Sequence, residues 1–235
     1  MKRKKEKFVG NIPEGLSSFN PSVFQREFLD IVEYSGHDII FTDSHAGTGK
    51  TTAALYYAFK QLCTNPHMKL VLVRTPAEMG KDRIGFLPGE ANLQDKLGPH
   101  FESAMKISKE MYGTNKFECD LDKKIFFTVP NYALGVTRED CIYIIDEAQL
   151  LEPLILKLLL ERIGKGTKTI VLGSSSQLYA DDKTGRNALR DAYKRFFNED
   201  GTQKYNNIVK YTFPIDAVMR HDVVKTVIEA YDKEV

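Results

Sequence analysis

The stretch HAGTGKT, residues 45–51, most constrains how this chain can fold. Its glycines, Lys50 and Thr51 match the end of the phosphate-loop pattern G-x-x-x-x-G-K-[ST], although Ser44 stands where the first glycine is expected. The apolar run Asp38–Thr42 precedes this turn, and a helical pattern follows it. Such a strand-to-helix turn gathers backbone N–H groups at the positive end of a helix, where they can bind phosphate. The sequence therefore predicts a nucleotide site in an α/β fold.

The residues of this loop have separate expected roles. Backbone N–H groups from Ala46 to Lys50 would surround a β-phosphate, and the Lys50 ammonium would reach the β and γ oxygens. Thr51 would offer its hydroxyl to Mg²⁺. The residues expected to contact ATP here are Ser44, His45, Ala46, Gly47, Thr48, Gly49, Lys50, Thr51 and Thr52. A tight turn that carries a surface lysine is the alternative interpretation.

A second motif, CIYIIDEAQ, supplies two carboxylates downstream. Four apolar residues, Ile142–Ile145, predict a buried strand that ends at Asp146, and Glu147 follows. Asp146 would bind the magnesium ion through water, and Glu147 would orient or deprotonate the attacking water. Two solvated acids at a strand end are the alternative. Gln177, after the next strand, is the candidate group that contacts the γ-phosphate; otherwise it is a surface glutamine.

Apolar runs and helical patterns alternate along the chain, which predicts a mainly parallel sheet with helices on both faces. The expected strands are Asp38–Thr42, Lys69–Thr75, Lys124–Val129, Cys141–Asp146, Lys168–Gly173 and Ile208–Phe213. A helix is expected between Asn20 and Gly36, with Asn20 as its N-cap. The 235 residues suit one large domain. We expect this domain to span residues 19–235, after a basic tail at residues 1–18.

Composition places the chain among ordinary globular proteins, with 42% hydrophobic and 28% charged residues. Its 33 Lys and Arg against 32 Asp and Glu produce no overall positive field that would attract nucleic acid. The opening MKRKKEK is a local exception, either a contact for a polyanion or a solvated tail. Three scattered cysteines predict no disulfide framework, and charges and a proline interrupt the richest apolar run. We therefore expect a cytoplasmic protein without a membrane span.

Several segments together resemble the PhoH family of RecA-like ATPases, which is related to the first motor domain of superfamily 1 helicases. These segments are AGTGKT, LVRTPAEMGKDRIGFLPGE, IIDEAQ, RIGKGTKTIVLG and VMRHDVVKTVIEAY. The resemblance covers about residues 20–235, and GFLPG is its most specific piece. It implies a single RecA-like P-loop NTPase domain with ATP and Mg²⁺ as cofactors, in a short phage or bacterial form of the family.

The resemblance also implies roles for further residues. Gln25 matches the position that reads the adenine edge in related helicases. Arg74 lies in a stretch that contacts single strands there, although a salt bridge over the sheet edge explains it equally well. Lys81 and Arg83, in the loop after it, are nucleic-acid candidates too. Arg220 is the candidate arginine finger for the γ-phosphate.

Two departures from the family pattern bear on activity. Ser44 and His45 replace Gly-Pro at the start of the loop, and Ser174 replaces the Asp that follows Gly173. Because Lys50 and the other catalytic groups remain, a working site is expected.

The expected function is a magnesium-dependent ATPase that is coupled to single-stranded RNA or DNA. An ATP-binding module that assembles a ring with negligible turnover is the alternative. A small-molecule kinase is a third possibility, disfavoured because kinases seldom carry Asp-Glu-Ala-Gln at this place. One domain leaves one face of the nucleotide exposed, which predicts a homo-oligomeric ring whose neighbour supplies Arg220. The resemblance suggests six subunits, and a monomer that uses its own Arg220 is the alternative.

Overall fold

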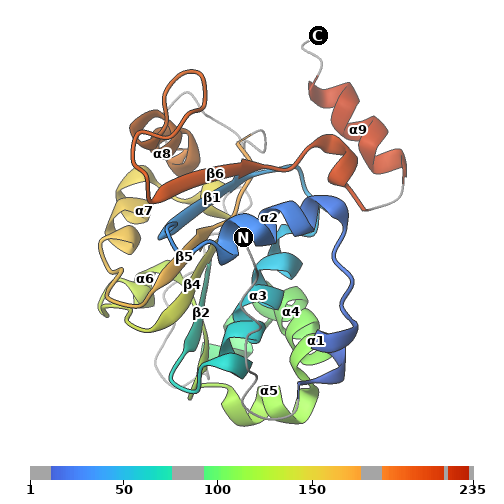
Figure 1. Cartoon of the computed structure of the whole chain (residues 1–235), viewed down its shortest axis with the longest axis vertical. Coiled ribbons are helices and arrows are strands. Elements are labelled where there is room, and N and C mark those ends of the chain that lie inside the picture. The colour runs from blue at the N-terminus through green and yellow to red at the C-terminus, as the bar shows by residue number, and fades with distance from the viewer. Residues whose placement is uncertain (1–11, 76–92, 176–186, 220–221, 233–235) are drawn as a thin grey trace.

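A six-stranded sheet in the order β3-β2-β4-β5-β1-β6 forms the centre of the protein (Figure 1). The computed structural model describes residues 12–75, 93–175, 187–219 and 222–232. The strands are β1 (Ile39–Asp43), β2 (Lys69–Arg74), β3 (Ile125–Thr128), β4 (Cys141–Asp146), β5 (Lys168–Val171) and β6 (Ile208–Thr212). Every neighbouring pair is parallel, as the apolar runs predict. All carboxyl ends therefore lie along one edge of the sheet.

Helices cover both faces of the sheet, which confirms the predicted fold class. The first face carries α1 (Glu14–Ser18), α2 (Val23–Glu33), α3 (Lys50–Thr64), α4 (Leu93–Tyr112) and α5 (Thr114–Asp120). The second carries α6 (Pro130–Ala133), α7 (Pro153–Leu160) and α8 (Ala188–Phe196). Within β4, Ile142 and Ile144 pack into the first core, whereas Tyr143 and Ile145 pack into the second. Burial on both sides explains why this strand reads as one continuous apolar run.

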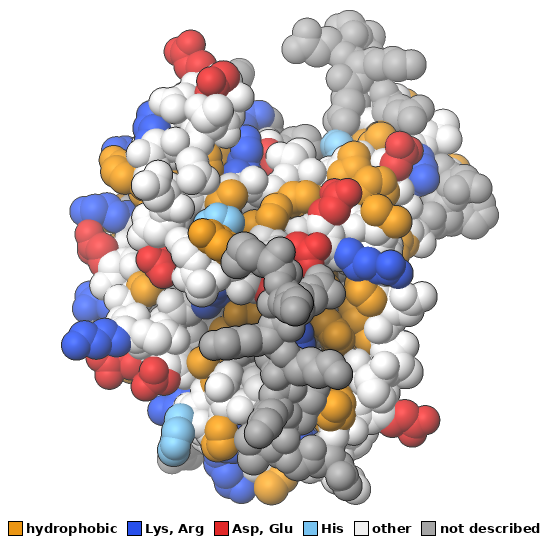
Figure 2. All heavy atoms as spheres, in the orientation of Figure 1, with side chains coloured by type: hydrophobic (Ala, Val, Ile, Leu, Met, Phe, Trp, Pro, Cys, Tyr) orange, Lys and Arg blue, Asp and Glu red, His pale blue; other side chains and the backbone are white. Residues whose placement is uncertain are grey.

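The last helix, α9 (Asp222–Asp232), stands away from the sheet (Figure 1). Val223 and Val227 on this helix are exposed. Two short 3-10 helices, η1 (Ala148–Leu150) and η3 (Ile215–Ala217), follow β4 and β6. No described helix is long and apolar enough to cross a membrane. Charges of both signs are interspersed over the face seen in Figure 2, in keeping with the near balance of acidic and basic residues.

Two sequence expectations about the amino-terminal region need correction. Residues 14–18, assigned to the tail, form α1, because Leu16 is buried in the core and Gly15 packs closely against the carbonyl of Glu110. Ser22 rather than Asn20 caps α2. Its hydroxyl accepts from the backbone N–H of Gln25, and the Gln25 side chain accepts from the backbone N–H of Ser22. This reciprocal capping box satisfies two otherwise unpaired donors. The basic residues of MKRKKEK lie outside the described residues.

Candidate nucleotide site

The glycine loop joins the end of β1 to the start of α3, as the sequence predicts. Gly47 and Gly49 have φ angles of 85° and 76°, a region that favours glycine. Gly49 is also crowded, because a Cβ there would collide with the side chains of Gln25 and Met219. The Met219 N–H donates to the Gly47 carbonyl at 3.0 Å, and the Thr48 hydroxyl donates to the His45 carbonyl at 3.3 Å. These contacts hold the loop in a compact shape at the amino end of α3.

Ser44 fits the start of this loop without a glycine. The described non-glycine residues with positive φ are Asp122, Asp140 and Glu147, so Ser44 keeps an ordinary backbone conformation. Its N–H donates to the Gly173 carbonyl at 3.2 Å, so hydrogen bonding to the chain that follows β5 continues past the end of β1. The side chain is buried, and its hydroxyl oxygen has no hydrogen-bond partner in the described part of the chain.

Thr51 and Asp146, the predicted metal ligands, lie together although 95 residues separate them. The Thr51 hydroxyl donates to Asp146 Oδ1 at 3.4 Å, and the Glu147 N–H donates to the same oxygen at 3.1 Å. The other oxygen, Oδ2, is buried and accepts no hydrogen bond from any residue that the structure describes. A hydroxyl and a carboxylate with an unsatisfied oxygen are hard donors of the kind that Mg²⁺ prefers. The residues present therefore fit a magnesium ion.

Burial dominates the electrostatics of Asp146, which is only 1% exposed. Desolvation raises the pKa of its carboxyl to about 6, and the negative charge of Glu147 adds to the rise. The positive charges of Arg74 and Lys50 act in the opposite direction. Ionisation of this carboxyl therefore lowers the stability of the folded protein, and a bound cation would offset that loss.

Glu147 begins a turn immediately after β4 and has a left-handed backbone, with φ 55° and ψ 41°. This conformation is uncommon for a residue other than glycine and is typical of strained functional positions. Gln149 Nε2 donates to Glu147 Oε2 at 2.6 Å, and Arg74 Nη2 lies 3.6 Å from Glu147 Oε1. Both carboxylate oxygens are thus engaged by neighbouring side chains. The sequence analysis missed Gln149, although it is the last residue of the quoted DEAQ motif.

Strand β5 lies between β4 and β1, and its end connects the two motifs. The Ser174 N–H donates to Gln149 Oε1 at 3.2 Å. The Asp43 carboxylate accepts from the Ser175 N–H at 2.8 Å and from the Ser175 hydroxyl at 2.6 Å. The carboxylate that binds this segment therefore belongs to Asp43, at the end of β1, whereas the family pattern places an acidic residue at position 174 itself. The sequence analysis did not identify this role of Asp43.

Gln25 and Arg74, assigned through the family resemblance, contact the site from two other elements. Gln25 is buried, and its Nε2 donates to the Gly49 carbonyl at 3.2 Å, so it ties α2 to the glycine loop. Arg74 forms the expected salt bridge, with Nη1 3.6 Å from Asp146 Oδ2. The adenine-reading role of Gln25 and the nucleic-acid role of Arg74 stay predictions.

The structure places the remaining predicted site residues in two groups. His45, Ala46 and Thr48 lie in the loop, and Lys50 and Thr52 lie in the first turn of α3. Four candidates lie outside the described residues: Lys81, Arg83, Gln177 and Arg220.

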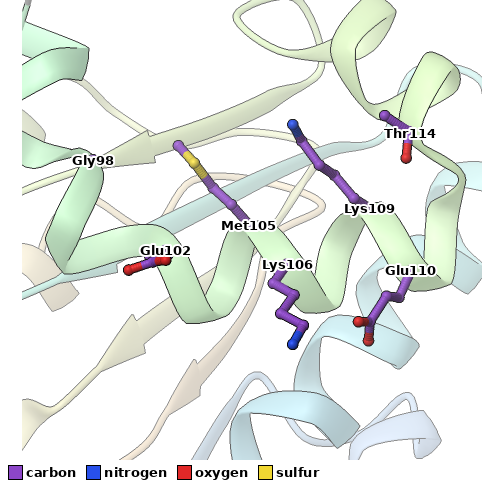
Figure 3. A pocket seen from close by; sticks show the side chains of 7 residues that line it. All are labelled: Gly98, Glu102, Met105, Lys106, Lys109, Glu110 and Thr114. Carbon is purple, nitrogen blue, oxygen red and sulfur yellow. The ribbon is translucent and has the colours of Figure 1, made fainter.

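A hollow of about 650 Å³ lies elsewhere, along α4 (Figure 3). Its lining consists of Gly98, Glu102, Met105, Lys106, Lys109, Glu110 and Thr114. Its charged side chains are of both signs, and Lys109 is paired with Glu118 at 3.0 Å. None of the predicted site residues lines this hollow, so it is not the site built from the two motifs.

Comparisons with known proteins agree with the motifs. The sequence matches the PhoH-like protein family over residues 20–232. A PhoH-like protein of Bacillus subtilis (strain 168) is 32% identical over 211 residues, which cover 89% of this chain and 62% of the relative. A PhoH-like protein of Synechocystis sp. is 30% identical over 218 residues, which cover 89% of this chain and 60% of the relative. The chain therefore spans less than two thirds of the length of these relatives.

The fold also has a solved counterpart. The ATPase domain of the large terminase of a Thermus phage superposes with a TM-score of 0.54 over 93% of this chain and 91% of that domain, at 12% identity. This likeness confirms that the chain has the fold of a RecA-like P-loop ATPase domain.

Asp146→Asn should stabilise the metal-free protein in a pH-dependent way. Folding raises the pKa of this carboxyl from 3.8 to about 6, so ionisation increasingly opposes folding as pH rises through that interval. The substitution should raise the free energy of unfolding by about 2 to 3 kcal/mol at pH 7.5 and have little effect at pH 4. Urea unfolding with a chelator at both pH values measures this. Asp191→Asn, at an exposed ion pair, is the control, and an Asp146→Asn effect equal at both pH values would contradict the prediction.

Proposed function

This chain belongs to the PhoH-like protein family, and on that basis we propose that it is a magnesium-dependent ATPase coupled to single-stranded RNA or DNA. The convergence of Thr51 with Asp146, 3.4 Å apart and followed by Glu147, is the observation that carries the proposal. A helix start that binds phosphate needs no such acidic partner, whereas a site that holds metal and activates water needs both carboxylates.

The residues divide the work of hydrolysis among them. The backbone of the glycine loop and the Lys50 ammonium bind the phosphates. Thr51 and Asp146 would hold Mg²⁺, which supplies positive charge against the phosphate oxygens when bound. Glu147 accepts a proton from the attacking water or orients it. Gln149 and Arg74 fix the Glu147 carboxylate, and Asp43 fixes the start of the segment that leads to Gln177. Gln177 contacts the γ-phosphate in this proposal.

Coupling to nucleic acid rests on the resemblance to helicase motor domains and on the basic opening of the chain. The proposed contacts are Arg74, at the carboxyl end of β2, and Lys81 and Arg83, which follow it in the sequence. The alternative, an ATP-binding assembly module with negligible turnover, was motivated by the serines at positions 44 and 174. Ser44 has an ordinary backbone conformation, and Asp43 supplies a carboxylate next to position 174. Both observations make it less necessary to assume that the two serines abolish hydrolysis. Steady-state phosphate release distinguishes the two functions.

The proposed active species is a homo-oligomeric ring. A single RecA-like domain leaves one side of the nucleotide open, and a neighbouring subunit can close it with Arg220. Six subunits follow from the family resemblance alone.

Lys50→Ala and Glu147→Gln should fail in different ways. Loss of the Lys50 ammonium removes charge-assisted contacts to the phosphates, so ATP binding should be lost. Glu147→Gln should still bind ATP but hydrolyse it roughly 10²-fold more slowly or worse. Calorimetry with ATP and phosphate release measure the two effects. Lys60→Ala on the same helix and Glu161→Gln, directly after α7, are controls that should leave both unchanged. Equal loss of binding in both site variants would contradict this division of roles.

Deletion of residues 1–7 tests the basic opening. If these residues contact phosphates, the deletion should weaken oligonucleotide binding and flatten its salt dependence, by about 0.7 in the log–log slope for each lost contact. Fluorescence anisotropy with matched RNA and DNA oligonucleotides at several salt concentrations measures the slope. The same oligonucleotides, added to the ATPase assay, test coupling. An unchanged slope would mean that the opening segment is merely solvated.

Mixed oligomers test the source of the arginine. A Lys50→Ala subunit cannot bind ATP but can lend Arg220 to a neighbour, and an Arg220→Ala subunit has the opposite defect. Mixtures should therefore recover part of the ATPase activity that neither variant has alone. No recovery at any ratio, together with a monomeric mass in ATP, would refute the ring.

A further inference from the structure

The guanidinium of Arg74 spans the two carboxylates of the candidate site. Arg74 ends β2 and lies directly beside Asp146 in the parallel register of β2 and β4. Its Nη1 is 3.6 Å from Asp146 Oδ2, and its Nη2 is 3.6 Å from Glu147 Oε1. A planar guanidinium can reach two separate carboxylates at once, which a lysine ammonium does with far less geometric control.

Arg74 is well placed to compensate the buried negative charge. Asp146 and Glu147 repel each other, and Asp146 is almost fully buried. A buried carboxylate without a nearby cation is strongly unfavourable. Asp146 Oδ2 accepts no hydrogen bond from the described residues, and the Arg74 guanidinium lies 3.6 Å from it as a countercharge.

The two ends of this contact differ in how firmly they are held. Glu147 has a second anchor, because Gln149 donates to its other oxygen at 2.6 Å. The Asp146 end relies on a longer ion pair that leaves Oδ2 without a hydrogen bond. A cation that approached Asp146 would repel the guanidinium from that end and leave the Glu147 contact in place.

We propose that Arg74 is a positioning residue that neutralises the metal-binding carboxylate in the nucleotide-free protein and yields it when a divalent cation binds. In the loaded site it keeps Glu147 oriented. This inference rests on the proposed function, since it takes Asp146 as the metal ligand. It assigns Arg74 a role in the reaction centre that does not depend on nucleic acid.

Two substitutions separate the charge of Arg74 from its shape. Arg74→Gln removes the charge but keeps amide donors. Arg74→Lys keeps the charge but loses the planar guanidinium that reaches both carboxylates. Mn²⁺ is the probe, measured by calorimetry or by the loss of its free EPR signal, on nucleotide-free full-length protein. Arg74→Gln should bind Mn²⁺ about tenfold more tightly than the wild type, because a competing cation has been removed. Arg74→Lys and the control Arg195→Gln, at an exposed ion pair, should match the wild type. The double variant Arg74→Gln with Asp146→Asn should lose the gain.

The second measurement concerns orientation. Both Arg74 variants should lower kcat of ATP hydrolysis with little change in ATP affinity, because the Glu147 carboxylate loses the forked contact. Equal Mn²⁺ affinity of Arg74→Gln and the wild type, including no binding by either, would overturn the inference. Full kcat in Arg74→Lys would overturn the orienting role. A wild type that neither binds nor hydrolyses ATP would refute the proposed function instead. The Mn²⁺ comparison would then still test whether the charge of Arg74 competes with a divalent cation.

Discussion

The burial of one carboxylate, Asp146, organises the whole carboxyl edge of the sheet. Asp146 ends a strand whose side chains are buried on both faces, so its charge sits among apolar neighbours instead of in water. Such a charge persists only where cations and donors surround it. Thr51 and Lys50 come from α3, Arg74 from β2 and the Glu147 N–H from the next peptide, and all of them act on this one group. The protein thus gives up stability at the place where a bound cation would restore it.

The strain at Glu147 has a comparable explanation. A left-handed backbone directly after β4 turns the chain sharply, and the Ala148 N–H then donates to the carbonyl of Leu172, the residue that follows β5. This turn brings Gln149 within reach of both Glu147 and the Ser174 N–H. One glutamine therefore links the candidate base to the end of β5. A shift of that strand end would therefore move the Glu147 carboxylate through two hydrogen bonds, from Ser174 to Gln149 and from Gln149 to Glu147.

Sequence alone predicted the elements that local patterns specify, and missed those that depend on contacts between distant segments. Strand β4 has the bounds that its apolar run predicted, and the glycine loop joins β1 to α3 as expected. A salt bridge of Arg74 was among the expectations, but its partners Asp146 and Glu147, like the contacts of Asp43, could not be foreseen, since they require knowledge of which strands are neighbours and in what register. The cap of α2 could have been predicted from the sequence, because Ser22 and Gln25 have capping-box spacing. Asn20 followed by Pro21 also fits the pattern of a helix start, and it was predicted instead. Leu16 likewise carries α1 into the core although only a short apolar signal marks it.

The departures from the family pattern show how a phosphate loop can keep its shape when its composition changes. A glycine is needed where φ is positive, and here that condition applies to Gly47 and Gly49 but not to Ser44. Ser44 directly follows β1, and its N–H pairs with the Gly173 carbonyl. The same geometry brings Asp43 opposite Ser175, so a carboxylate at the end of β1 holds the chain that follows β5. Asp43, the last residue of β1, and the Ser44 N–H that follows it therefore both bond to the chain beyond β5, so a carboxylate contacts the segment around Ser174 although position 174 itself carries none.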